Sequence, residues 1–88
     1  MTDAPDVRTE LAQALSWWGD LSDIRQAAFA QLASAMGTQR FLRQKAMLLT
    51  AETGNWGMTA YRIKHCRWGR ENHPLSNVLA KQIETGVA

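Results

Sequence analysis

Several kinds of residue and segment are scarce in this chain of 88 residues, and each scarcity excludes a class of protein. Cys66 is the one cysteine, which excludes an internal disulfide and a CxxC pair for zinc. No apolar run approaches the ~20 residues that span a bilayer. Nowhere do β-branched residues alternate along a run bounded by turns, as in a strand. We therefore expect a small globular protein without metal, cofactor or membrane span.

The beginning of the chain also lacks the pattern of a targeting segment. Residues Met1 to Asp6 are acidic and polar rather than basic and then apolar, so we expect no signal peptide. This fits synthesis in a reducing compartment, with Cys66 as a small buried thiol. We expect residues 1–5 to be flexible and residues 6–88 to form one domain, because a chain of this length builds one core.

Apolar residues recur at helical spacing along the chain, and glycine, proline or polar turn residues separate the segments. The pattern predicts five helices, over residues 6–18, 22–36, 39–52, 56–68 and 74–85, with Asp3 or Asp6 capping the first and Gly86 ending the last. Short helices joined by short loops predict an all-α fold, a compact orthogonal bundle around a central second helix. The residues expected to face inward are Val7, Leu11, Ala14, Leu15, Trp18, Ile24, Ala28, Leu32, Ala35, Met36, Phe41, Leu42, Ala46, Leu48, Leu49, Ala60, Tyr61, Ile63, Cys66, Leu75, Val78, Leu79 and Ile83.

Charge is distributed unevenly along the sequence. Residues 1–39 hold five acidic and two basic side chains, whereas residues 40–70 hold seven basic side chains against Glu52 alone. The basic stretch suits an anionic partner such as cell-wall polymer, nucleic acid or an acidic protein surface. A solvated helix face would have the same pattern, and both interpretations stay open here.

Aromatic residues mark two candidate contact surfaces. Neighbouring helix residues point about 100° apart, so we expect Trp18 in the core and Trp17 as an interface residue. Arg62 and Arg70 accompany Tyr61 and Trp68 in a mixture that stacks on sugars or binds anions. We expect Tyr61 to be buried and leave Trp68 open between core and contact surface.

Short motifs follow one another along the chain in an informative order. They are Leu21-Ser-Asp-Ile-Arg25 with Ala28, Met36-Gly37, Trp56 with Ala60, Arg67-Trp68 and Thr85-Gly86. Their order and spacing resemble the C-terminal helical lobe of the phage-type lysozymes, in which a central buried helix ends in Met-Gly and a Trp opens a later helix. The resemblance extends from Asp6 to Gly86 and depends on the collinear set, since no single motif is specific.

The resemblance implies a function mainly by what is missing. In the family the catalytic glutamate, its aspartate partner and a threonine belong to an N-terminal lobe, and nothing before Asp6 corresponds to that lobe. It thus implies a phage or prophage module that is not catalytic alone, serving as a virion or tail component or as a peptidoglycan-binding lobe, in the virion or the host cytoplasm. Arg67 and Trp68 match the family's Arg-Trp pair near the cleft, which implies substrate binding. Ala35 replaces a family glutamine, which weakens that expectation.

Two other functions remain as alternatives. Glu52-Thr53-Gly54 resembles the acid/base element of lytic transglycosylases and goose-type lysozymes, which would make Glu52 catalytic in a muramidase or transglycosylase fragment. The predicted helices around Gly37 also suit a helix-turn-helix DNA-binding protein, although the second of them is too apolar to read many bases. His65, His73 and Cys66 predict neither a metal site nor a Cys–His nucleophile.

Overall fold

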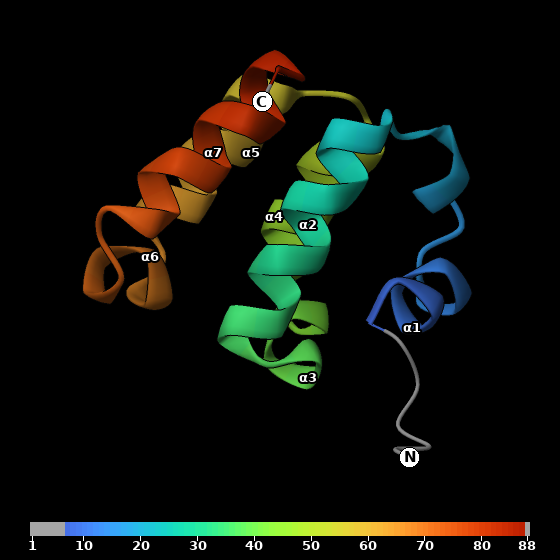
Figure 1. The fold of residues 1–88 in the computed structure, drawn as a ribbon, viewed down its shortest axis with the longest axis horizontal. Coiled ribbons are helices and arrows are strands. Elements are labelled where there is room, and N and C mark those ends of the chain that lie inside the picture. Colours follow the sequence, from blue (N-terminus) through green and yellow to red (C-terminus); the bar gives the residue numbers. More distant parts are fainter. Residues whose placement is uncertain (1–6, 88) are drawn as a thin grey trace.

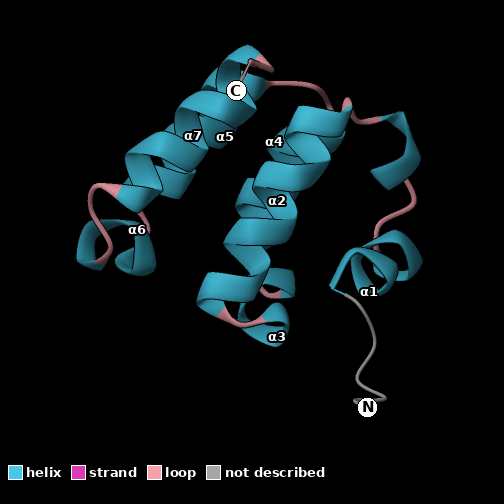
Figure 2. Cartoon of the chain, viewed as in Figure 1, coloured by secondary structure: helices cyan, strands magenta, loops and turns pink. Residues whose placement is uncertain are grey.

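The computed structural model describes residues 7–87, and the structural statements below concern this part of the chain. It contains helices and turns but no strand, which confirms the predicted all-α class (Figure 2). None of these helices has both the length and the apolar character to cross a membrane. The expected caps at Asp3 and Asp6 and the expected flexible residues 1–5 lie outside the described part. The elements are α1 (Val7–Ala14), a 3₁₀ turn η1 (Trp18–Asp20), α2 (Asp23–Met36), α3 (Thr38–Leu42), α4 (Lys45–Glu52), α5 (Trp56–His65), α6 (Arg67–Glu71) and α7 (Leu75–Thr85).

The second helix, α2, is central, as predicted. The Ser22 hydroxyl caps its start by accepting a hydrogen bond from the backbone N–H of Arg25 (3.3 Å), and Gly37, with a φ of 99°, follows its last residue. It contacts α1, α3 and α7, and Figure 1 shows it between α1 and the adjacent pair α5 and α7. Its buried residues are Ala28, Phe29, Leu32, Ala33 and Met36.

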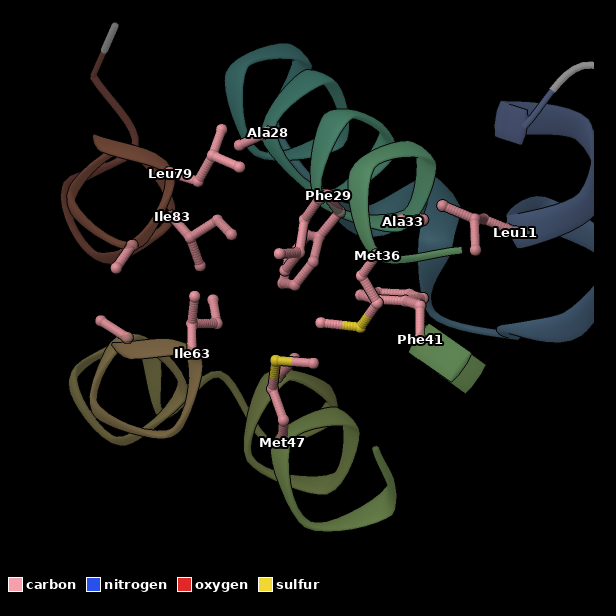
Figure 3. Packing of buried hydrophobic residues seen from close by; sticks show 14 of the residues in the cluster. Leu11, Ala28, Phe29, Ala33, Met36, Phe41, Met47, Ile63, Leu79 and Ile83 are labelled. Atoms are coloured by element: carbon pink, nitrogen blue, oxygen red, sulfur yellow. The ribbon is translucent and has the colours of Figure 1, made fainter. Parts of the chain in front are cut away.

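Phe29 of α2 lies fully buried at the centre of the core (Figure 3). Its ring meets Trp17 and Phe41 in edge-to-face contacts, each with centroids 6.1 Å apart, and lies 6.4 Å from Trp56. Such pairs add to the free energy gained from burial itself. Phe29 therefore joins the turn after α1, α3 and the start of α5 through one side chain.

Arg25, in the first turn of α2, connects this helix to α7 and to α5. Its Nε donates to the carbonyl oxygen of Ile83 (2.7 Å) and its Nη2 to that of Glu84 (3.1 Å), so it satisfies carbonyls in the last turn of α7. Its guanidinium also lies 4.3 Å above the ring of Trp56. Gly86, with φ 72° and ψ 17°, follows as the predicted left-handed end of α7.

The predicted helix over residues 39–52 is wrong in one respect, because the chain breaks it in two. Gln44, with φ −79° and ψ 66°, leaves the helical region between α3 and α4. The break rotates α4 relative to the predicted stripe. Met47 and Ala51 therefore face the core, and Leu49 lies exposed.

The predicted helix over residues 56–68 is also divided. Cys66 (ψ 166°) ends α5, and its Sγ accepts a hydrogen bond from the backbone N–H of Gly69 (3.3 Å), capping α6. Cys66 is half-buried rather than the buried thiol we expected. Gly69 packs directly on α5, because an added Cβ would collide with the carbonyl oxygen of Ile63. The buried hydroxyl of Ser76 donates to the carbonyl oxygen of Gly69 (2.7 Å) and so fastens α6 to α7.

The predicted core is confirmed at most large residues and wrong at others. Helical periodicity alone marks a wider apolar face than neighbouring helices cover. Each break in a helix also changes which residues of the following helix point toward the core. Six residues expected inward are exposed: Ala14, Ala35, Ala46, Leu49, Tyr61 and Val78. Six buried hydrophobic residues were not among those expected: Phe29, Ala33, Met47, Ala51, Trp68 and Ala80.

Replacing Gly69 with alanine is expected to destabilise the fold by about 2–3 kcal/mol, because the backbone of α5 must move to admit the methyl group. In thermal unfolding this corresponds to a melting temperature lower by roughly 10–20 °C. Gly57→Ala is the matched control. It lies in α5 with open space around the new Cβ and should leave stability unchanged or slightly raised. Equal melting temperatures for the two variants would contradict the close approach of α6 to α5.

Candidate functional site

An open groove of about 590 Å³ lies between the start of α4 and the C-terminal half of α5. We call it the α4–α5 groove. Its walls combine cations, an aromatic ring and an imidazole with a short apolar floor. The lining residues are Arg43, Gln44, Lys45, Ala46, Met47, Tyr61, Arg62, His65 and Cys66.

The groove exists because two breaks in the chain place separate helices against each other. The break at Gln44 redirects α4 so that its first turn meets α5, and the break at Cys66 ends the other wall. The hydroxyl oxygens of Thr50 and Thr59, 2.8 Å apart, fasten α4 to α5 behind the groove. The walls are therefore held by packing and hydrogen bonds rather than by the charged residues themselves.

Tyr61 and His65 form a stacked pair of rings on the α5 wall, which we call the Tyr61–His65 platform. They are four residues apart, so they lie on the same face of the helix, and their rings stack with centroids 4.1 Å apart. Tyr61 is 54% exposed, so the expectation that it belongs to the core is wrong. Its phenol ring is therefore available for contact with a ligand.

The groove concentrates positive charge. Arg43, Lys45 and Arg62 line it, and no carboxylate of the described residues does. None of the three forms an ion pair with residues 7–87, where Arg67–Glu71 is the pair observed. Arg62 lies in the last turn of α5, where a cation is favourable, whereas Lys45 opens α4, where a cation opposes the helix dipole. An anion bound here would relieve that opposition.

Three residues predicted from the sequence lie outside the groove. Trp68 is only 4% exposed and packs in the core, so it presents little surface to a sugar. Arg67 is exposed and pairs with Glu71 (Nε to Oε2, 3.2 Å). Arg70 is exposed on the short helix α6. Sugar binding by Arg67 and Trp68 stays a prediction, and Arg62 is the predicted residue that the structure places in the groove.

Trp17 and Glu52 meet on a different surface. Trp17 is partly buried against the core, and both residues line a shallow groove of about 430 Å³ and a smaller one of about 240 Å³. Asp20 and Trp56 share the smaller groove with them. Glu52 is exposed at the end of α4. A general acid depends on a desolvated carboxyl group, and Glu52 lacks that environment.

The sequence indicates the basic stretch and places Tyr61 beside it, but the exposure of Tyr61 was not predicted. The spacing of Tyr61 and His65, one helical turn apart beside Arg62, is the signal that identifies the platform. Among the described residues no group of three histidine, cysteine or acidic side chains is placed to hold a metal ion.

Comparison with family models, curated proteins and solved structures finds no match to this chain. The likeness to phage-type lysozymes therefore depends on the motifs themselves. In the fold Met36-Gly37 ends α2, Trp56 opens α5 and Thr85-Gly86 ends α7. Arg67-Trp68 opens α6 instead of closing the preceding helix.

Truncation of Trp68, which the sequence left open between core and surface, and of Tyr61, which it placed in the core, should differ strongly in its effect on stability. Trp68→Ala is expected to cost about 3–5 kcal/mol of folding free energy, because it empties a buried site. Tyr61→Ala should cost less than about 1 kcal/mol, since the ring is largely in solvent. Urea unfolding followed by tryptophan fluorescence and circular dichroism measures both. A large loss of stability in Tyr61→Ala would refute its placement on the surface.

Proposed function

We propose that this chain is a lysozyme-like helical module of phage or prophage origin that binds peptidoglycan through the α4–α5 groove and does not cleave it alone. The observation that carries the proposal is the groove itself, which combines the exposed Tyr61–His65 platform with three cations that form no ion pair with residues 7–87. The order of the motifs along the chain supports the lysozyme-like part of the proposal.

The groove matches the two chemical components of peptidoglycan. Its glycan strands present C–H faces of sugar rings, which stack on aromatic rings such as that of Tyr61. Its peptide stems carry carboxylates, to which a guanidinium such as that of Arg62 donates two parallel hydrogen bonds. Arg43 and Lys45 on the opposite wall add charge, and neither is paired with a carboxylate of residues 7–87.

Absence of catalysis follows from the groups that the groove contains. Glycoside hydrolysis requires a carboxylic acid at the leaving oxygen and usually a second carboxylate or a positioned water molecule. No carboxylate of the described residues lines the α4–α5 groove, and Glu52 lies exposed on another surface. Within the described part of the chain, a wall polymer bound in the groove would thus meet cations and an aromatic ring but no carboxylate.

The helix-turn-helix alternative receives less support. Its recognition helix would have to be α3, which has five residues and uses Phe41 in the core. The cations of the groove suit phosphate as well as carboxylate, so nucleic acid remains an outcome to be measured. Placement in a virion or tail, with virion proteins as partners, follows from the family resemblance and is part of the proposal.

Charge reversal in the groove should weaken binding to purified peptidoglycan. Arg62→Glu is expected to lower affinity about tenfold or more in a sedimentation assay with insoluble walls, since it removes a charged hydrogen-bond donor and adds repulsion. Arg70→Glu is the matched control, because Arg70 is exposed outside the groove and the change in net charge is identical. Equal losses in both variants, or tighter binding of wild type to duplex DNA than to walls, would contradict the proposal.

Catalysis by Glu52 has its own test. The purified chain is expected to leave the turbidity of a bacterial wall suspension unchanged, and Glu52→Gln should behave identically. A complete phage lysozyme serves as the positive control. Clearing by the wild-type chain that is lost in Glu52→Gln would establish the alternative, with Glu52 as acid/base.

A further inference from the structure

Helix α4 exposes an apolar side chain between two opposite charges. Leu49 is 61% exposed, and the partly buried Leu48 lies next to it on the same helix. Lys45, Leu48, Leu49 and Glu52 all line the groove of about 430 Å³, which Trp17 closes on its other side. We call this surface, defined by these five residues, the α4 patch.

The order of residues in the patch makes it complementary to itself. Lys45 and Glu52 are seven residues apart, about two helical turns, so they mark the two ends of one helix face with the leucines between them. Neither forms an ion pair with residues 7–87. When two copies of this face are placed antiparallel, the basic end of each lies against the acidic end of the other.

We propose that the α4 patch binds a second copy of this chain, with the two α4 helices antiparallel across a twofold axis. Lys45 of each copy then lies against Glu52 of the other, which makes two equivalent ion pairs. Leu49 of each copy fills the groove beside Trp17 of the other. A parallel arrangement would instead bring like charges together at both ends.

A second copy fits better than an unrelated partner, because every feature needed for the contact occurs on this one patch. A twofold contact uses the same surface on both subunits, so it requires such self-complementarity. Trp17 supplies a large, partly buried ring of the kind that anchors interfaces. The patch is small, so we expect a weak dimer, with a dissociation constant on the order of 0.1 mM.

Charge exchange tests the arrangement directly. In a concentration series by sedimentation equilibrium, the wild-type mass should rise toward that of a dimer. Glu52→Lys is expected to weaken association about tenfold or more, because it creates two repulsive contacts at once. Lys45→Glu should do the same. The double variant Lys45→Glu/Glu52→Lys restores both pairs in reversed order, and an equimolar mixture of the two single variants should also associate.

The controls separate this contact from general charge effects. Glu84→Lys on α7 makes the same change in net charge at an exposed position outside the patch and should associate like wild type. Leu49→Ser should weaken association without altering helix content in circular dichroism, since the side chain is exposed. Glu52→Lys is the more informative single variant, because Glu52 does not line the α4–α5 groove, whereas Lys45 does. Its effect on association is therefore separate from any effect on the proposed wall binding. A monomeric wild type at ~1 mM, association unaltered in Glu52→Lys, or a double variant that stays monomeric would overturn the proposal.

Discussion

The burial of Phe29 is the contact on which the rest of the architecture depends. Its ring touches Trp17, Phe41 and Trp56, which belong to segments far apart in the sequence. Short helices have little stability in isolation, so they need a common packing partner. A single aromatic ring on the central helix supplies it, and Arg25, one turn earlier on α2, also contacts the ring of Trp56.

Two departures from regular helix decide which residues reach the surface. At Gln44 the chain turns so that Met47 enters the core and Leu49 leaves it. At Cys66 it turns again, and Trp68 becomes buried while Arg67 stays in solvent. The groove and the α4 patch both lie on α4, so both owe their positions to the break at Gln44.

The two proposals assign different surfaces of one small fold to different partners. The α4–α5 groove is cationic, whereas the α4 patch lies beside Trp17 and is apolar with a charge at each end. Lys45 lines both surfaces. In the proposed dimer Lys45 would pair with Glu52 of the other copy, which leaves Arg43 and Arg62 as the free cations of each groove. Two such grooves in one dimer would strengthen attachment to a repeating polymer such as a cell wall.

The sequence alone determined the all-α class, the central second helix with its glycine stop, the turn at Gly54 and the end of α7 at Gly86. These features are local, because they depend on helical periodicity and on residues that cap or end helices. The break at Gln44 contains neither glycine nor proline. The cap of α6 is the Cys66 thiol rather than one of the usual cap residues. Neither break could therefore be predicted from a local sequence signal. Only the tertiary structure decided that Tyr61 is exposed, that Trp68 is buried and that Arg43, Lys45 and Arg62 share a groove. The physical reason is that burial depends on where neighbouring helices lie, and that position is set by contacts across the whole core.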